Sequence, residues 1–259
     1  MKSRPALRFL GLAYLAMLLL VPVGLVFYRT FESGFGPFWD SITTPAAISA
    51  FWLTILVAAI AVPLNTIFGV IAALVLARGK FRGKALLDAI IDLPFAVSPV
   101  VAGLALILVF GAGGWISLPF QVIFSVPGVV LATIFVSLPF VVREVTPVLV
   151  EIGDEQEQAA ATLGASGWQA FWRITLPAIR WGVAYGVVLS VARSIGEFGA
   201  VSVVSGKVAG ETQTLTLLVE ERFQNFDLAG AYAASALLAV IALATLLILS
   251  RIDPRDGGE

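Results

Sequence analysis

The chain has 259 residues, of which 59% are hydrophobic and only 13% are charged, and its mean hydropathy is +0.98. A water-soluble globular fold could not bury that much apolar surface, so the composition predicts an integral membrane protein. The formal net charge is −1, and neither Cys nor His occurs. Their absence excludes disulfides, thiolate nucleophiles, imidazole bases and the commonest zinc and haem ligands.

The phosphate-binding loop G-x-x-x-x-G-K-[ST] does not occur either. Neither Gly83-Lys84 nor Gly206-Lys207 has a glycine five residues earlier or a Ser or Thr afterwards. We therefore expect no cofactor in this chain, and any ATP and Mg²⁺ that the system uses would be bound by another chain. The expected surroundings are a lipid bilayer and partner proteins, without nucleic acid.

Six stretches are apolar and long enough to cross a bilayer core of about 30 Å, which takes about 20 helical residues. The predicted spans cover approximately residues 8–28, 50–77, 86–111, 128–150, 178–204 and 229–250. The expected fold class is therefore an all-α integral membrane protein with six transmembrane helices. We divide the chain into a segment with the first span and a periplasmic loop (1–49), a transmembrane core (50–250) and a cytoplasmic tail (251–259).

The first span resembles a secretory signal in that basic residues precede an apolar run. That run, from Phe9 to Phe27, exceeds the usual length of about 7–15 residues, and Phe27-Tyr28-Arg29 offers no small-residue cleavage site. We expect this segment to be retained as a helix. Prolines predict kinks within or at the ends of several spans: Pro22, Pro63, Pro94, Pro99 and Pro139.

The basic residues predict the orientation, because Lys and Arg that flank spans in short loops stay in the cytoplasm. Of the 16 Lys and Arg residues, 12 fall on the side that carries both termini and the segment 151–177. The exceptions are Arg29, Lys207 and Arg222 in the opposite loops, and Arg193 inside the fifth span. Both termini are therefore expected in the cytoplasm.

The polar segment 151–177, between the fourth and fifth spans, is predicted to begin with a short helix. Asp154 and Glu157 fit a capping box at the start of this helix. Gly164 suits the left-handed position that ends a helix, since it has no side chain to clash. The segment is therefore expected to turn at Gly164.

A second short helix is predicted after this turn, because Ser166 and Gln169 fit another capping box. Pro177 is expected to end it. A stripe of small and apolar residues runs across both helices at Ala160, Leu163, Gly164, Gly167 and Phe171. Two interpretations stay open on this pattern: an amphipathic segment on the membrane or on its own helix ends, or a docking site for a partner protein.

One run in this segment resembles the EAA loop of the inner-membrane permeases of type I binding-protein-dependent ABC importers. It reads Gln158-Ala159-Ala160, three residues, Gly164, nine residues, Ile174, one residue, Leu176-Pro177. Gln158 stands where that family usually has Glu, and the neighbouring Glu157 offers a negative charge.

The resemblance implies the type I ABC importer permease fold over residues 50–250, in a multi-pass protein of the bacterial inner membrane. It implies a non-catalytic subunit that works with ABC ATPase subunits, a second similar permease and a periplasmic binding protein. The loop would insert into a groove on the ATPase. The residues implied to couple to the ATPase are Glu157, Gln158, Ala159, Ala160, Leu163, Gly164, Trp168 and Phe171.

Two further stretches, 192–206 and 211–220, are similar to the sulfate/thiosulfate permeases of the W type. The run Gly196-Glu197-Phe198-Gly199-Ala200 also occurs in molybdate permeases, whereas the longer stretch after Gly206, which ends with residues 226–231, favours sulfate. The resemblance therefore implies import of sulfate or thiosulfate, with a periplasmic sulfate-binding protein as a partner. A molybdate or tungstate permease of the same architecture is one alternative, and an autonomous secondary anion transporter or channel is another.

Arg193 is predicted to lie well inside the fifth span, where ionisable residues face the protein interior or a water-filled path. An anion path would use Arg193, Ser194 and Glu197. However, Glu197 lies one helical turn after Arg193, so an internal ion pair would explain both residues without a substrate.

Asp88 and Asp92 share a helix face near the cytoplasm. They suit a proton relay, or carboxylates at a helix start beside Arg82 and Lys84. On the periplasmic side, one apolar helix face is predicted, and it fits either an interfacial helix or a contact with a binding protein or partner permease. Its residues are Leu215, Leu218, Val219, Phe223 and Phe226.

Overall fold

The computed structural model describes the backbone of residues 3–252 and the side chains of residues 9–245, 247 and 248. Within these residues, all regular secondary structure is helical, which confirms the predicted all-α fold. Lys2 and residues 253–259 of the predicted cytoplasmic tail lie outside the described residues. The helices are α1 Ser3–Phe31, α2 Phe35–Ile42, α3 Pro45–Arg78, α4 Lys84–Ala96, α5 Pro99–Phe110, α6 Val126–Ile152, α7 Glu155–Thr162, α8 Gly167–Ala170, the π-helix η1 Phe171–Thr175, α9 Leu176–Ile195, α10 Gly199–Val204, α11 Leu215–Gln224 and α12 Leu228–Ile252.

Five helices of the described chain are long and apolar enough to cross a membrane: those in α1, α3, α6 and α12, and the continuous helix Gly167–Ile195. A sixth span requires α4 and α5 together, which are bent by 113°. The expectation of a continuous third span over 86–111 is therefore wrong. The break falls at Val97 and Ser98, where ψ of Ser98 is 133° because the following Pro99 disfavours a helical conformation there.

The fifth predicted span also ends earlier than expected, at Ile195 instead of residue 204. After a break over residues 196–198, α10 begins as a separate short helix. The Oε1 atom of Glu197 accepts a hydrogen bond from the backbone N–H of Ala200 at 2.9 Å. This carboxylate satisfies a donor that the start of α10 would otherwise leave without a partner.

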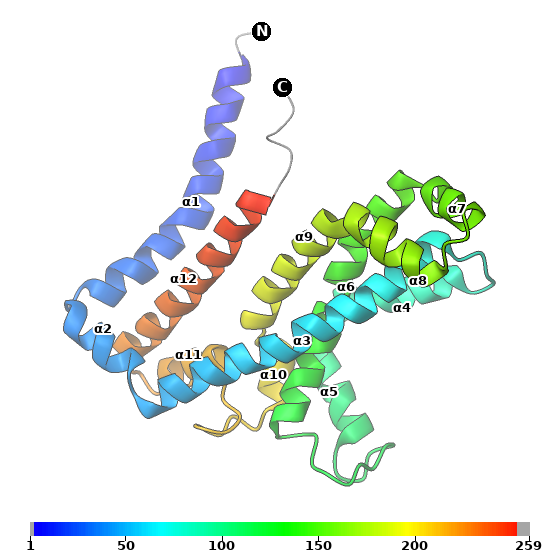
Figure 1. Ribbon diagram of the computed structural model, residues 1–259. Helices are drawn as coiled ribbons and strands as arrows, with labels where there is room; N and C mark the ends of the chain where they lie inside the picture. The colour runs from blue at the N-terminus through cyan, green and yellow to red at the C-terminus, as the bar shows by residue number, and fades with distance from the viewer. Residues whose placement is uncertain (1–2, 253–259) are drawn as a thin grey trace.

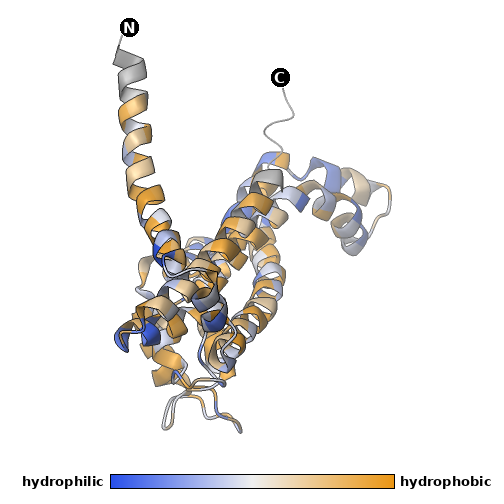
Figure 2. Cartoon of the chain, turned by 90° about the vertical axis from the view of Figure 1, so that its left-hand side faces the viewer, coloured by the Kyte–Doolittle hydropathy of each residue, from blue (hydrophilic) through white to orange (hydrophobic). Residues whose placement is uncertain are grey.

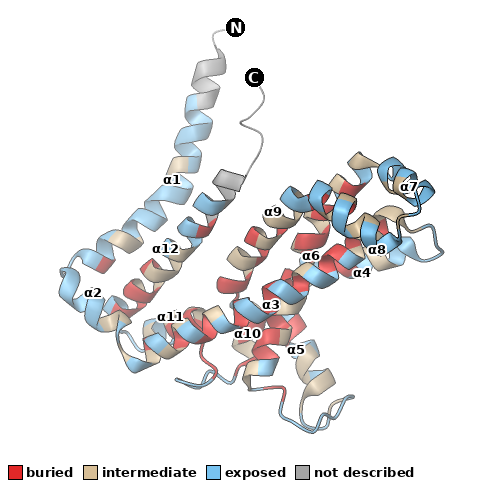
Figure 3. Cartoon of the chain, in the orientation of Figure 1, coloured by how far each residue is buried: buried red, intermediate tan, exposed pale blue. Residues whose placement is uncertain are grey.

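The core lies where α3, α6 and α9 cross, and buried residues concentrate there in Figure 3. Val141 and Val145 of α6 are fully buried against Ala73 of α3 and Ile179 of α9. A Cβ atom on Gly69 would lie 2.8 Å from the Cβ of Val141. The close approach of α3 and α6 therefore needs glycine at this position.

The two ends of the molecule differ in what they carry. The start of α1 and the end of α12 lie at the same end as α7 and α8, whereas α2, α11 and the loop after α5 lie at the opposite end (Figure 1). Figure 2 shows hydrophobic residues along the long helices and hydrophilic residues gathered at α7 and α8. The described ends of the chain and the segment 151–177 therefore share one side.

The apolar face predicted over residues 215–226 is only partly right. Leu215 and Leu218 are buried against α3 and α12 of the same chain. Phe223 and Phe226 are instead 63% and 88% exposed. Phe226 leaves the face that the helical spacing assigned to it because α11 ends at Gln224, whereas Phe223 lies within α11 and is left uncovered by this chain.

Candidate functional site

The first helix of the segment 151–177 ends at glycine, as the sequence predicts. Gly164 has φ +85°, and a Cβ atom there would meet nothing within 4 Å, so the preference for glycine comes from the backbone conformation alone. The N–H groups of Gly164 and Ala165 donate to the carbonyls of Ala161 and Ala160, each at 3.0 Å. This pattern is a Schellman motif, which satisfies the last carbonyls of α7.

The second capping box is confirmed as well. The N–H of Gln169 donates to Ser166 Oγ at 3.3 Å, and the N–H of Ser166 donates to Gln169 Oε1 at 2.9 Å. Pro177 does not end this helix, contrary to the prediction. The π-helix η1 links α8 to α9 in one continuous helix, and Pro177 directly follows this π-helical segment as the second residue of α9. The loop is thus continuous with the fifth span.

The first capping box is wrong, although its helix forms. The Asp154 side chain makes no capping hydrogen bond. The carboxylate of Glu157 turns toward the spans, where its Oε1 accepts from Thr175 Oγ1 at 2.8 Å and lies 3.3 Å from Arg78 Nη2. A charged guanidinium is a stronger partner than the backbone N–H that a capping box would use.

The exposed tip of the segment is apolar. Leu163 is 88% exposed, Trp168 70% and Trp172 50%, and Gln158 and Ala159 beside them are also exposed. Trp172 was not among the predicted coupling residues, although it directly follows Phe171, which was. Apolar side chains gathered at a polar end of a protein are typical of a protein–protein contact.

Besides Glu157, two other predicted coupling residues are partly buried. Phe171 packs against the core cluster that contains Ile179, and its ring centre lies 6.1 Å from that of Trp168. Ala160 is half-buried, and its carbonyl accepts the hydrogen bond from Ala165. Phe171 thus holds the loop on the bundle and Ala160 stabilises the end of α7, whereas Leu163, Gly164 and Trp168 lie at the accessible tip.

The predicted pair of Arg193 and Glu197 is present, but Arg193 lies in the last turn of α9 and not well inside the span, and Glu197 lies in the break after α9. Arg193 Nη2 lies 2.7 Å from Glu197 Oε2, with the Arg193 side chain 33% exposed and that of Glu197 only 1% exposed. The hydroxyl of Thr216 donates to the backbone carbonyl of Glu197 at 2.8 Å. The stretch 211–220, which suggested sulfate, therefore supports the chain break that carries this pair.

Ser194 does not lie beside Arg193 on an accessible face. It is buried, and its Oγ donates to Ser137 Oγ of α6 at 3.4 Å. Ser137 in turn accepts from Asn65 Nδ2 of α3 at 2.8 Å. Ser194 thus belongs to a buried polar cluster where three helices cross.

The carboxylates of Asp88 and Asp92 have a partner that the sequence did not indicate. Arg143 Nη2 lies 2.8 Å from Asp88 Oδ1, and Arg143 Nε donates to Asp92 Oδ1 at 2.6 Å. Arg143 lies within α6, although it is one of the 12 basic residues whose placement predicted the cytoplasmic side. The expected neighbours Arg82 and Lys84 form none of the ion pairs identified among the described side chains.

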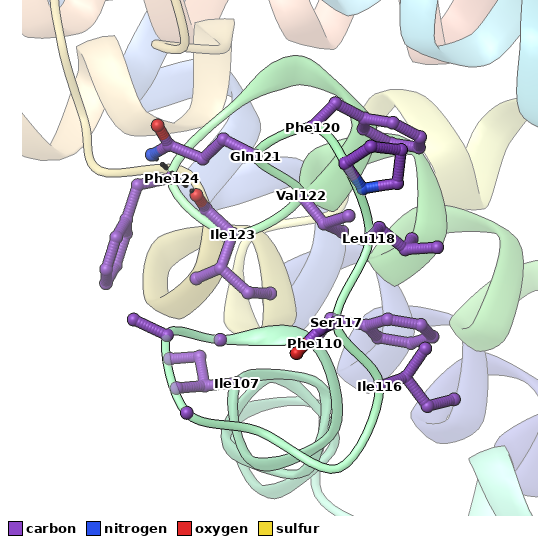
Figure 4. A pocket seen from close by; sticks show the side chains of 14 residues that line it. Ile107, Phe110, Ile116, Ser117, Leu118, Phe120, Gln121, Val122, Ile123 and Phe124 are labelled. Carbon is purple, nitrogen blue, oxygen red and sulfur yellow. Dashed lines mark hydrogen bonds between the residues drawn. The ribbon is translucent and has the colours of Figure 1, made fainter.

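A separate pocket of about 790 Å³ lies beneath the loop after α5 (Figure 4). Phe110, Ile116, Leu118 and Val122 point into it, and the Gln121 side chain donates to the Ile123 carbonyl at 2.9 Å. The described residues that line it include no charged side chain. This pocket therefore lacks the charge that would favour an anion.

The chain is similar to known membrane transport proteins over nearly its whole length. Residues 65–255 match the model of the family described as "Binding-protein-dependent transport system inner membrane component". The sulfate transport system permease protein CysW of Synechocystis sp. is 52% identical over 96% of this chain and 92% of its own length. CysW of Escherichia coli is 47% identical over 95% and 86%, and the permease CysT of that organism is 40% identical over 94% and 88%.

The fold is also similar to that of solved transporters. The crystal structure of a bacterial alginate ABC transporter in complex with an alginate pentasaccharide-bound periplasmic protein contains a chain with a TM-score of 0.77. That likeness covers 98% of this chain and 95% of the other at 18% identity, so it concerns the fold alone. The protein is a multi-pass membrane protein, and it belongs to the family of inner-membrane components of binding-protein-dependent transport systems.

Proposed function

We propose that this chain is a permease subunit of an ATP-driven importer that carries sulfate or thiosulfate inward across the inner membrane. The observation that carries the proposal is the 52% identity, over 96% of the chain, with a permease named for sulfate transport. This chain would form part of the path of the anion, and its segment 151–177 would transmit the motion of the ATPase to the spans. A second, similar permease, ATPase subunits that bind ATP and Mg²⁺, and a periplasmic sulfate-binding protein would complete the importer.

In this proposal α4 and α5 form one broken third span, so that the chain has six spans and cytoplasmic termini. The sorting of the basic residues supports this orientation, because 11 of the 16 fall on this side even when Arg143, which lies within α6, is left out. The cytoplasmic orientation of the termini is also supported by Figure 1, in which the start of α1 and the end of α12 lie at the same end as α7 and α8.

The exposed tip of the segment 151–177 would dock on the ATPase. Leu163 and Trp168 are more than two-thirds exposed, and Gly164 between them leaves the surface free of a side chain. Burial of each large apolar side chain in a groove of the partner would contribute about 1.5–3 kcal/mol. Because α8 continues through η1 into α9, a displacement of Trp168 would reach the fifth span directly, whereas Leu163 ends α7 on the other side of the turn at Gly164.

We further propose that, of the three residues first considered for the anion path, only Arg193 meets the anion. One third of its side chain is exposed, whereas Glu197 and Ser194 are buried. Glu197 would then hold the guanidinium in place and cap α10.

The function is tested in a host that lacks its own sulfate permeases. Expression of this chain with its partner subunits should restore growth on sulfate as the sole sulfur source and energy-dependent uptake of radioactive sulfate. Uptake of molybdate without sulfate would instead favour the molybdate or tungstate alternative. Anion flux through the chain alone, without an ATPase, would favour the secondary transporter or channel.

A further inference from the structure

A single guanidinium at the end of α3 contacts two other elements. Arg78, the last residue of α3, donates from Nη1 to the Leu149 carbonyl at 2.8 Å and from Nη2 to the Gly153 carbonyl. The same Nη2 lies 3.3 Å from Glu157 Oε1. The Arg78 side chain is 22% exposed and that of Glu157 26%. Arg78 therefore joins the carbonyl end of α6 to the first turn of α7.

The Glu157 carboxylate extends this connection to the fifth span. Its Oε1 also accepts from the hydroxyl of Thr175 at 2.8 Å. Thr175 is the last residue of η1, directly before α9, and is 3% exposed. One carboxylate oxygen thus links α7 with α3 and with the entry to α9.

Apart from these polar contacts, α7 packs mainly against α8 and η1 of the same loop. The helix has eight residues, none of them buried, and it is too short to be stable alone in water. It follows Gly153, which has φ +65°, and Asp154, which forms no capping bond. A push on the tip could therefore turn α7 about Gly153 unless polar contacts prevent that motion.

We infer that Arg78, Glu157 and Thr175 form a coupling lock, which fixes α7 to α3, α6 and α9 so that a displacement of the tip moves the spans. Arg78 and Thr175 act through Glu157 and are positioning residues for energy coupling. Glu157 belongs to this lock and is not a contact with the ATPase. The inference rests on the proposed function of the segment as the docking site.

The test measures sulfate transported per ATP hydrolysed by the complete transporter in liposomes, together with the amount of ATPase that co-purifies. The variants are Arg78→Gln, Glu157→Gln, their combination, and Thr175→Val, with Thr175→Ser as the variant that keeps the hydroxyl. Glu155→Gln is the matched control, because Glu155 is an exposed carboxylate on the same turn of α7. Arg78→Lys keeps the charge and should recover part of the lost coupling.

Each of Arg78→Gln, Glu157→Gln and Thr175→Val should lower the amount of sulfate transported per ATP about threefold or more, because the interaction free energies of contacting residues correspond to changes of this size. The amount of co-purified ATPase should stay unchanged. The double variant should be no worse than the worse single variant, and Thr175→Ser and Glu155→Gln should retain the ratio. Where Arg78→Gln fails to accumulate, Thr175→Val carries the test, because it removes only a hydroxyl group.

Wild-type transport ratios in Glu157→Gln and Thr175→Val would overturn the lock. Loss of the ATPase in Glu157→Gln would overturn it too, since Glu157 would then be a docking contact. A wild-type complex that imports no sulfate would reject the proposed function instead, and this result is obtained in the same assay without any variant.

Discussion

Arg143→Gln removes the cation that holds two carboxylates of α4. In the wild-type chain Arg143 lies 2.8 Å from Asp88 Oδ1 and 2.6 Å from Asp92 Oδ1, so one guanidinium fastens two turns of α4 to α6. The glutamine would leave these carboxylates, one helical turn apart, facing each other without a counterion. Like charges at this spacing repel, which adds to the lost attraction.

The size of the effect follows from the exposure of the three side chains. Breaking a fully buried ion pair costs about 3–5 kcal/mol, and breaking an exposed pair about 0–1 kcal/mol. The Arg143 side chain is 35% exposed, and those of Asp88 and Asp92 are 45% and 44% exposed. We therefore expect a loss between these limits, about 2 kcal/mol, which lowers the melting temperature of a chain of this length by about 4–8 °C.

Thermal unfolding of the purified chain in detergent measures this loss. Combining Arg143→Gln with Asp88→Asn and Asp92→Asn should recover most of the melting temperature, because no unpaired charge is left. Lys84→Gln, at an exposed residue of the same helix, is the control and should melt like the wild type. The reasoning is refuted if Arg143→Gln melts at the wild-type temperature, or if the triple variant is no more stable than the single one.

Three other predictions concern topology, docking and the anion. In this Cys-free chain, Gly167→Cys should react with an impermeant thiol reagent from the cytoplasm and Ala209→Cys from outside; the reverse pattern rejects the orientation. Gly164→Asp should reach normal levels, because left-handed strain costs only about 1–2 kcal/mol, yet it should lose co-purified ATPase or coupled uptake through the added charge. Wild-type uptake and ATPase association in Gly164→Asp would reject the docking role of the loop. Arg193→Gln should lower sulfate uptake at least about tenfold while assembly and basal ATP hydrolysis persist; normal uptake would reject a role for Arg193 in the anion path.

The features that local sequence encodes were predicted well. The long apolar stretches, the helix end at Gly164 and the capping box at Ser166 depend on residues within one or two turns of each other, so periodicity and capping rules are sufficient. Pro99 also carried the signal for the break between α4 and α5. The angle of 113° between α4 and α5, however, depends on how α5 packs against α10, and no local sequence pattern encodes that packing.

The polar contacts that define the candidate site were the part that sequence could not provide. Glu157 pairs with Arg78, 79 positions away, and Arg143 pairs with Asp92, 51 positions away. A local rule assigned Glu157 to the nearest available backbone N–H, although a charged partner from another span binds it more strongly. The pair of Arg193 with Glu197 was predicted from their spacing of four residues, and it forms although α9 ends at Ile195, between them.

Uptake by the complete transporter tests the proposed sulfate import most directly. This chain, its partner permease, the ATPase and the sulfate-binding protein would be reconstituted in liposomes and supplied with radioactive sulfate. We predict accumulation of sulfate against its gradient only when ATP, the binding protein and this chain are all present. Sulfate flux through this chain without ATP, or ATP-driven accumulation of molybdate with none of sulfate, would contradict the proposed function.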